Sequence, residues 1–286
     1  MSDTAVNAAS TASSTEDVHE DGTSGIRRIV STGRLDYTRV QRIGIGALSV
    51  LAFFSLWSAS TTFTDVNPIF LPSLSSIRDA IIESYSSGAL MPNLYSSVTL
   101  FIACMALALG IAIPLGILIG AIEPLNRTFG TWFWTIYTAP RIVFIPLVLI
   151  WFGYSTAAKV VIVIISSVPP AVVMIMEGAK TVEGSMLRAA RSFGASRFDQ
   201  LRKVVLPGTL PYVGTGIRMG VARGLVGLFG AELFTGRDGL GFLLADAGKR
   251  YNIPLVFGTL AMYLVMCMVM VSASATVEKR LSRWRD

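Results

Sequence analysis

The sequence predicts an all-α membrane protein with six transmembrane helices, and its composition and apolar pattern both point to this fold class. Hydrophobic residues make up 52% of the 286 residues, charged residues only 15%, and the mean hydropathy is +0.61. The apolar residues fall into blocks of about twenty, the length that an α-helix needs to cross a bilayer. Because a soluble domain carries about a quarter charged residues, this composition excludes an ordinary soluble enzyme and a disordered protein.

Residues 1–40 are predicted to form a disordered cytoplasmic tail. The first 25 residues contain five acidic side chains, no Lys or Arg, and few large apolar groups. Such a segment cannot bury enough surface to offset the entropy cost of ordering it. Arginines at positions 27, 28, 34, 39 and 42 then surround the start of the first apolar block. This cluster is typical of the cytoplasmic flank of a membrane helix.

The six spans are predicted at residues 43–60, 94–120, 130–152, 157–176, 209–231 and 254–277. Residues 41–92 hold the first span and an external segment with an amphipathic helix near 74–87, whose helical apolar spacing predicts a position on the membrane surface. Residues 93–278 form the core with the other five spans, and residues 279–286 form a basic cytoplasmic tail. Pro140 and Pro146 predict that the third span is a kinked helix.

The distribution of positive charge predicts the orientation. With the N-terminus inside, the cytoplasmic segments are 1–42, 121–129, 177–208 and 278–286. They hold 16 Lys and Arg residues, against 5 in the external segments. Cytoplasmic loops of membrane proteins carry the excess of Lys and Arg. We therefore expect both termini in the cytoplasm of a multi-pass protein of the bacterial cell membrane.

Three charged residues at or near the predicted spans are candidates for a translocation pathway: Arg141, Arg223 and Glu232. A charge at a helix centre costs about 2.5–3.5 kcal/mol on insertion scales and therefore usually has a function or a partner. Arg141 either packs within a kinked helix or faces an aqueous cavity that favours anions. Arg223 either lines a pathway or pairs with Glu232 or Asp246. The alternative for Glu232 is solvation at the external end of its helix, whereas Arg218 lies close enough to the cytoplasm to snorkel.

Glycines recur every four residues in two of the spans, at positions 216, 220 and 224 and at positions 116 and 120. Small residues at this spacing lie on one face of a helix and allow another backbone to approach closely. The pattern predicts close helix packing and indicates nothing about a substrate.

No feature of the sequence predicts catalysis. The segment Gly178-Ala179-Lys180-Thr181 lacks the glycines of a phosphate-binding loop. A single histidine, His19, excludes a His-based triad or a His-rich metal site, and the two cysteines, at 104 and 267, are predicted to be buried thiols. We expect no catalytic residue, metal site or cofactor in this chain, and no nucleic-acid partner. If ATP drives transport, another chain hydrolyses it.

The cytoplasmic segment 177–208, which we call the coupling loop, has the pattern of a helix, a break and a second short helix. One apolar face is formed by residues 186, 187, 190 and 193. Gly194 permits a backbone turn, and Ser196 is placed to cap the next helix. Phe198 gives that helix an apolar face, and Pro207 is expected to end it. A short helix of this kind can dock into a groove on a soluble partner.

The spacing of the coupling loop resembles the EAA loop of bacterial ABC importer permeases. Ala189-Ala190, three residues, Gly194, nine residues and Val204-Val205-Leu206-Pro207 match that pattern, with Arg188 in place of its glutamate. Further segments are similar to the nitrate, sulfonate and taurine branch of these permeases: Pro140-Arg141, Pro146-Leu147, Trp151-Phe152-Gly153, Ala231-Glu232-Leu233, Gly239-Leu240-Gly241 and Lys279-Arg280-Leu281.

The resemblance implies the fold of a type I ABC importer permease, with a second permease subunit, often an identical one, completing the pathway. It also implies two ATPase subunits, which would use ATP and Mg²⁺, and an external substrate-binding protein. The residues expected to contact the ATPase are Ala189, Ala190, Gly194, Ala195, Ser196, Arg197, Phe198, Leu206 and Pro207.

The cargo that this resemblance implies is a small anion such as a sulfonate, taurine, nitrate or an aromatic acid. The alternative within the same architecture is an uncharged or cationic molecule, such as a thiamine precursor. An ATP-independent secondary transporter or channel would instead favour repeated halves and mid-membrane acidic residues. A membrane-embedded structural subunit without a pathway is the third reading.

Overall fold

The computed structural model describes residues 39–64, 67–182 and 184–282, and all of its regular structure is helical. The predicted N-terminal tail and the last four residues of the basic tail lie essentially outside these ranges. The chain divides into two units at Ser60 and Thr61. The described part of the first unit, residues 39–60, belongs to helix α2 (Arg39–Phe63), whose residues Gly44–Phe63 are long and apolar enough to cross a membrane.

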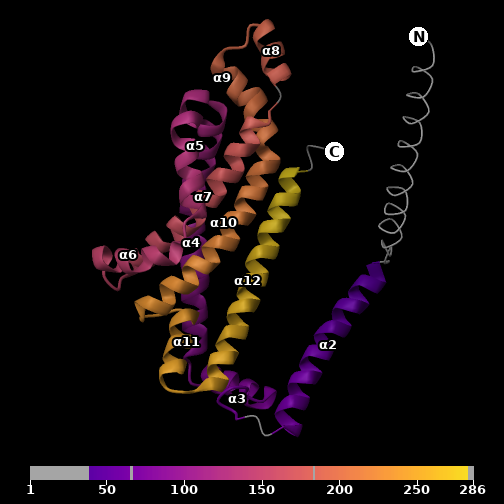
Figure 1. Cartoon of the computed structure of the whole chain (residues 1–286), viewed down its shortest axis with the longest axis vertical. Coiled ribbons are helices and arrows are strands. Elements are labelled where there is room, and N and C mark those ends of the chain that lie inside the picture. Colours follow the sequence, from indigo (N-terminus) through magenta and orange to yellow (C-terminus); the bar gives the residue numbers. More distant parts are fainter. Residues whose placement is uncertain (1–38, 65–66, 183, 283–286) are drawn as a thin grey trace, which may run out of the picture. The chain divides into compact units, whose positions relative to one another are not determined.

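The second unit contains the other helices, which Figure 1 shows as a set of long helices with shorter ones at their ends. In chain order they are α3 (Leu74–Ser86), α4 (Leu90–Ala121), α5 (Glu123–Thr138), η1 (Arg141–Val143), α6 (Phe144–Phe152), α7 (Thr156–Lys180), α8 (Gly184–Ser192), α9 (Arg197–Gln200), η2 (Leu201–Val205), α10 (Leu206–Thr235), α11 (Leu240–Lys249) and α12 (Ile253–Ser282).

The predicted count of six spans is not fully supported by the lengths and compositions of these helices. Helices α2, α4, α7 and α12 qualify as spans, and the pair formed by α5 with η1 and α6 adds a fifth if it crosses as one bent unit. Helix α10 is 30 residues long, but seven glycines and three charged residues lower its hydropathy. Its crossing therefore stays a prediction.

The third predicted span, 130–152, is not one continuous helix. Helix α5 ends at Thr138, Ala139 is extended at φ −63° and ψ 139°, and the chain resumes in η1 and α6 after a bend of 84°. A residue before proline avoids helical dihedral angles, and Pro140 has no N–H to donate. The kink expected at this proline is therefore a complete break, which turns Arg141 away from the axis of α5.

The amphipathic helix near 74–87 is confirmed as α3. Its N-cap is Ser73, whose hydroxyl accepts a hydrogen bond from the Ser76 N–H at 3.2 Å. Ile81 on its apolar face packs against α12, where Gly258 leaves room for the side chain. Part of the apolar face that the sequence assigns to the membrane surface thus packs against the protein itself.

Helix α7 is the centre of the second unit, between α4 and α10 (Figure 1). Four apolar side chains within five residues of this helix have no exposed surface: Val172, Val173, Ile175 and Met176. A Cβ atom on Gly116 of α4 would lie 2.7 Å from Ile175, and one on Gly216 of α10 would also lie 2.7 Å from it. The glycine spacing thus correctly predicts close packing, and both glycine faces contact α7.

Replacing Gly120 with valine is expected to destabilise the second unit. A Cβ atom there would collide with the carbonyl oxygen of Met176 and lie 2.6 Å from Ala179 Cβ, and overpacking of this kind costs about 1–3 kcal/mol. Gly110→Val on the same helix is the control, because a Cβ at Gly110 meets nothing within 4 Å. Thermal unfolding of the purified protein in detergent should show a lower midpoint for Gly120→Val only. Equal midpoints would contradict the packing.

Candidate functional site

The coupling loop turns sharply at Gly194. This residue has φ +76°, in the left-handed region that side chains disfavour. The Gly194 N–H donates to the Arg191 carbonyl at 2.9 Å, and the Ala195 N–H donates to the Ala190 carbonyl at 3.0 Å. These bonds satisfy carbonyl groups at the end of α8. The turn predicted at Gly194 is confirmed, and a larger residue there would strain it.

Ser196 caps α9 as predicted. Its hydroxyl accepts from the Asp199 N–H at 3.1 Å and donates to the Asp199 carboxylate at 2.6 Å. Lys203 forms an ion pair with the same carboxylate at 2.8 Å. The hydrogen bonds from Lys203 and Ser196 lower the pKa of Asp199 to about 2. The carboxylate therefore stays charged at physiological pH, and the short helix keeps its cap.

Gln200, which was not among the predicted site residues, stabilises the turn through hydrogen bonds of its side chain. The side chain is buried, its Nε2 donates to the Ala195 carbonyl at 3.0 Å, and its Oε1 accepts from Arg191 Nε at 3.3 Å. It joins the end of α8 to the start of α9. A glutamine among arginines gives no spacing signal, because its contacts exist only once the turn has formed.

The rigid turn presents large apolar side chains to its surroundings. Phe193 is 90% exposed, Phe198 69% and Met186 58%, whereas Leu187 packs into the core below. The predicted apolar face of α8 is therefore divided between the core and the surface. Of the other expected docking residues, Ala189, Gly194, Ser196, Arg197, Leu206 and Pro207 are exposed, and Ala190 and Ala195 are half-buried.

Pro207 does not end the short helix, as the sequence led us to expect. The π-helical segment η2 follows α9 directly and leads into α10, where Pro207 is one of the first two residues. A proline in a regular helix loses one backbone hydrogen bond and collides with the carbonyl four residues earlier. The wider π turn before Pro207 accommodates the ring, so the chain stays helical from Arg197 to Thr235.

Arg141 and Arg223, which the sequence predicted separately, lie at one cavity of about 220 Å³. It is lined by residues of η1, α6, α7 and α10: Arg141, Ile142, Ile145, Ile162, Ser166, Arg223, Val226, Gly227 and Gly230. The two guanidinium groups are close enough to repel each other electrostatically. The break at Pro140 is what brings Arg141 to the same cavity as α10.

Arg141 is only partly satisfied by the protein. Its Nη2 donates to the Tyr137 carbonyl at 2.6 Å, and its guanidinium lies 5.7 Å from the centre of the Tyr137 ring. Its Nε is buried and has no hydrogen-bond partner. No acidic side chain is among the residues that line the cavity. The cavity therefore has an excess of positive charge.

The expected pairing of Arg223 with Glu232 or Asp246 is not found within the described ranges. Asp246 forms an ion pair with Arg250 at 3.0 Å, and Glu232 accepts hydrogen bonds elsewhere. Arg218, five residues before Arg223 on the same helix, pairs with Glu278 of α12 at 3.1 Å. Arg223 thus stays available to the cavity, whereas Arg218 joins two helices.

Glu232 is fully buried and is not solvated at a helix end. It accepts hydrogen bonds from the Ser97 hydroxyl at 2.6 Å and from the Gly241 N–H at 2.9 Å. The Ser97 hydroxyl in turn accepts from the Leu240 N–H at 2.8 Å. Glu232 therefore satisfies the N-terminus of α11 and does not line the cavity with the two arginines.

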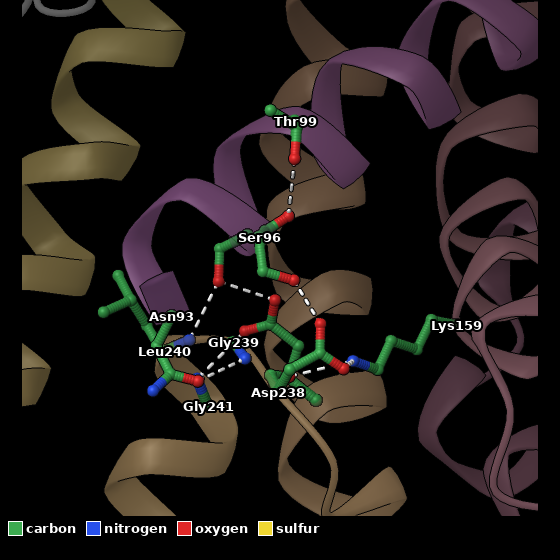
Figure 2. A network of polar contacts seen from close by, with 10 residues as sticks. Asn93, Ser96, Thr99, Lys159, Asp238, Gly239, Leu240 and Gly241 are labelled. Carbon is green, nitrogen blue, oxygen red and sulfur yellow. Dashed lines mark hydrogen bonds and ion pairs between the residues drawn. The ribbon is translucent and has the colours of Figure 1, made fainter. Parts of the chain in front are cut away.

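Lys159, counted from the sequence as an external charge, is also buried, with 1% of its side chain exposed. Its ammonium contacts the Asp238 carboxylate at 2.6 Å and the Asp238 carbonyl at 2.8 Å (Figure 2). The Ser96 hydroxyl contacts the other carboxylate oxygen. Burial opposes ionisation of Asp238, but the hydrogen bonds from Lys159 and Ser96 outweigh it and lower the pKa of that carboxyl.

Together these contacts form a polar clasp that joins the N-terminal parts of α4 and α7 to the end of α10, the loop after it and the start of α11. We define the clasp by Asn93, Ser96, Ser97, Lys159, Glu232, Asp238 and the N–H groups of residues 239–241. The sequence did not predict α11 or the clasp. Glu232 was named as a pathway candidate, and the motif Gly239-Leu240-Gly241 was noted for resemblance only.

Ser97→Ala is expected to destabilise the clasp, because it leaves the buried Leu240 N–H without an acceptor and Glu232 with one donor fewer. A buried unsatisfied group costs about 1–3 kcal/mol. Thr99→Ala is the control, since Thr99 is exposed and bonds only to carbonyls of its own helix. Hydrogen exchange of the α11 amides should rise in Ser97→Ala alone; unchanged protection would contradict the assignment.

The chain is similar to known transport proteins. The family described as "Binding-protein-dependent transport system inner membrane component" matches residues 112–283, more than half of the chain. The taurine transport system permease protein TauC of Escherichia coli is 27% identical over 256 residues, which cover 88% of this chain and 92% of TauC. The putative aliphatic sulfonates transport permease protein SsuC of Bacillus subtilis is 24% identical, with 84% and 87% covered.

A riboflavin transport system permease protein, RibX of Chloroflexus aurantiacus, is 25% identical, with 83% of this chain and 88% of RibX covered. Among solved structures, a chain of the MetNI methionine ABC transporter in an inward-facing conformation matches with a TM-score of 0.57 at 19% identity. The match covers 68% of this chain and 96% of that one. The fold is that of a type I ABC importer permease, as the resemblance implied. The chain belongs to the family of binding-protein-dependent transport system inner membrane components.

Proposed function

We propose that this chain is the permease subunit of an ATP-driven importer that takes up a small anion. The observation that supports this most strongly is the unbroken helical run from Arg197 to Thr235. It joins the exposed Phe198 of the coupling loop to Arg223 at the cavity. At 1.5 Å per residue the separation along the helix is roughly 40 Å. A push on the loop is therefore transmitted to the cavity wall.

The ATPase is a separate chain in this proposal, and it alone binds ATP and Mg²⁺. The docking element is the coupling loop, where Phe193 and Phe198 lie exposed on a turn fixed by Gly194, Ser196 and Gln200. An apolar knob of this kind fits a hydrophobic groove on a soluble partner. Arg188 is exposed beside it, and it would favour an acidic contact on that partner.

The loop lies in the cytoplasm, and both termini lie on the same side. The 16 Lys and Arg residues of the cytoplasmic segments, against 5 in the external segments, support this orientation. A second copy of the chain closes the pathway, and an external binding protein delivers the cargo. Each partner shifts the equilibrium between inward-open and outward-open states through contacts that differ between them.

The cargo class follows from the charge of the cavity. Arg141 and Arg223 line the cavity, and no acidic side chain is among its lining residues. The cavity therefore attracts an anion and repels a cation. The relative named for aliphatic sulfonates agrees with an anionic cargo, and the relative named for taurine transports a zwitterion that also carries a sulfonate. The relative named for riboflavin supports an uncharged cargo as the alternative. The arginine variants described below distinguish the two, because loss of a positive charge should weaken the transport of an anion.

Phe198→Asp is expected to abolish co-purification of the ATPase while the permease still inserts, because a carboxylate replaces the apolar side chain that docks. Gly194→Trp should act in the same way by straining the turn. Tyr251→Asp is the control: it exchanges an even more exposed aromatic residue at the opposite end of the second unit. Recovery of the ATPase with Phe198→Asp would defeat the docking assignment.

Arg223→Gln and Arg141→Ala are expected to lower uptake of an anionic cargo by at least tenfold at unchanged protein level, since each removes a positive charge from the cavity. Arg127→Gln is the control, because Arg127 is an exposed residue paired with Glu123 on α5. Uptake is measured with radiolabelled cargo in cells that express the whole transporter. Normal uptake by both cavity variants would remove the arginines from the pathway.

A further inference from the structure

A second cavity, of about 410 Å³, lies between α4 and the segment that leads from the coupling loop into α10. We call it the α4 groove, and its lining residues are Pro114, Ile117, Leu118, Phe198, Leu201, Arg202 and Leu206. Six of these seven side chains are apolar. Pockets of about 300–1,000 Å³ enclose most of the surface of a small organic ligand. The groove therefore has room for an apolar chain beside one charged group.

The α4 wall of the groove belongs to a helix that is long and apolar enough to cross a membrane. Leu118 is 38% exposed, and Pro114 is exposed as well. Because the other helices leave these side chains uncovered, they face lipid or another protein when α4 spans the bilayer. The groove therefore opens toward the bilayer, near the end of α4 at which the coupling loop lies.

The opposite wall carries a guanidinium group that has no acidic partner. Arg202 of η2 is exposed, and within the described ranges it forms no ion pair. Asp199, the acid of this segment, accepts from Ser196 and pairs with Lys203. Residues 184–208 hold five Lys and Arg residues against this one Asp. The groove thus joins hydrocarbon on α4 to an unpaired positive charge in a basic segment.

We propose that the α4 groove binds an anionic phospholipid of the cytoplasmic leaflet, with an acyl chain along its apolar side chains and the phosphate on Arg202. Basic pockets between membrane helices on the cytoplasmic side suit such headgroups, and a guanidinium group donates to phosphate through two parallel hydrogen bonds. Only the choice of leaflet depends on the orientation in the proposed function. Neither the cargo nor the ATPase takes part in the binding.

The two protein occupants fit the groove less well. An apolar helix of a second copy would bury Arg202 without an acid to pair with it, and an unpaired buried charge is strongly unfavourable. A soluble ATPase approaches from the cytoplasm, whereas Pro114 and Ile117 belong to the membrane-crossing helix. A phospholipid supplies both the hydrocarbon and the negative charge that the two walls require.

The bound lipid contacts Phe198, the side chain that we propose docks into the ATPase. The Phe198 ring lines the groove and is nevertheless 69% exposed, so it has surface for both contacts. An occupied groove therefore supports the coupling loop against α4.

Dioleoylphosphatidylglycerol and dioleoylphosphatidylcholine form a matched pair of probes, because they share their acyl chains and phosphate and differ in net charge. Binding of each lipid to the full-length chain in neutral detergent is measured by native mass spectrometry. Phosphatidylglycerol should bind about fivefold more tightly, the effect of one Lys or Arg on an anionic headgroup. Equal affinities would overturn the proposal.

Arg202→Gln should remove this preference by lowering the affinity for phosphatidylglycerol to that for phosphatidylcholine. Arg280→Gln is the matched control: Arg280 is exposed in the last turn of α12 and does not line the groove. Both variants lose one positive charge, so a non-specific attraction would weaken equally in the two. An equal effect, or no effect of Arg202→Gln, would contradict the phosphate contact.

Leu118→Trp should weaken the binding of both lipids at least fivefold, because the indole fills the groove. Leu115→Trp is the control, since Leu115 is 37% exposed on the same helix but does not line the groove. Both variants must keep the melting temperature of the unaltered chain. If Leu118→Trp unfolds, Leu206→Trp fills the groove from the opposite wall. Unchanged binding in a folded groove variant would overturn the acyl-chain site.

Two further outcomes would assign the groove to another occupant. Displacement of phosphatidylglycerol by inorganic phosphate would indicate a site for a free anion, and loss of the bound lipid on addition of the ATPase would indicate a protein contact. Either result would overturn the proposal. The proposed function is tested separately by uptake and by co-purification of the ATPase, and it stands even if the groove binds no lipid.

Discussion

The close approach of α4 and α10 to α7 is the constraint on which the rest of the second unit depends. Glycines on the two outer helices face Ile175 and its neighbours, so that backbones meet where side chains would otherwise hold them apart. Within a bilayer, dispersion contacts and hydrogen bonds replace the hydrophobic effect between helices. This packing fixes the position of α10. Helix α10 contributes Arg223 to the cavity and is continuous, through η2, with α9, which carries Phe198 of the coupling loop.

The charged residues of this unit divide into two groups by their partners. Lys159, Glu232 and Arg218 each bond to a specific protein group, and they hold helices together at the two ends of the bundle. Arg141 and Arg223 converge on a cavity without an acidic residue. An unpaired charge in a membrane is energetically unfavourable. A bound anion can therefore stabilise Arg141 and Arg223, whereas the first group is already stabilised by protein partners.

The features that depend on local chemistry were accessible from the sequence. Gly194 and Ser196 specify a left-handed turn and a helix cap, and both need only neighbouring residues. The glycine spacing likewise gave the packing faces. Arg141 and Arg223 were each recognisable as charges in apolar segments, but their meeting was not, because it depends on an 84° bend at Pro140 whose direction no local pattern encodes.

The remaining features depend on contacts between distant parts of the chain. The sequence predicts Lys159 as an external charge, because its partner Asp238 lies 79 residues later in the chain. The sequence allows a solvated Glu232, because the contacts that bury it come from Ser97 and the start of α11, which are distant in the chain or separated by a loop. Pro207 reads as a helix end, because the π turn that accommodates it has no sequence signature.

The central claim is that the helix from the coupling loop to the cavity transmits the action of the ATPase. It is tested most directly by the accessibility of Val226→Cys, in a chain with Cys104 and Cys267 replaced, to a membrane-impermeant maleimide in inside-out vesicles containing the whole transporter. A non-hydrolysable ATP analogue should lower the labelling rate from the cytoplasmic side, and two glycines in place of Leu201 and Arg202 should remove that response. Labelling that ignores the nucleotide, or a response that survives the glycines, would contradict the account.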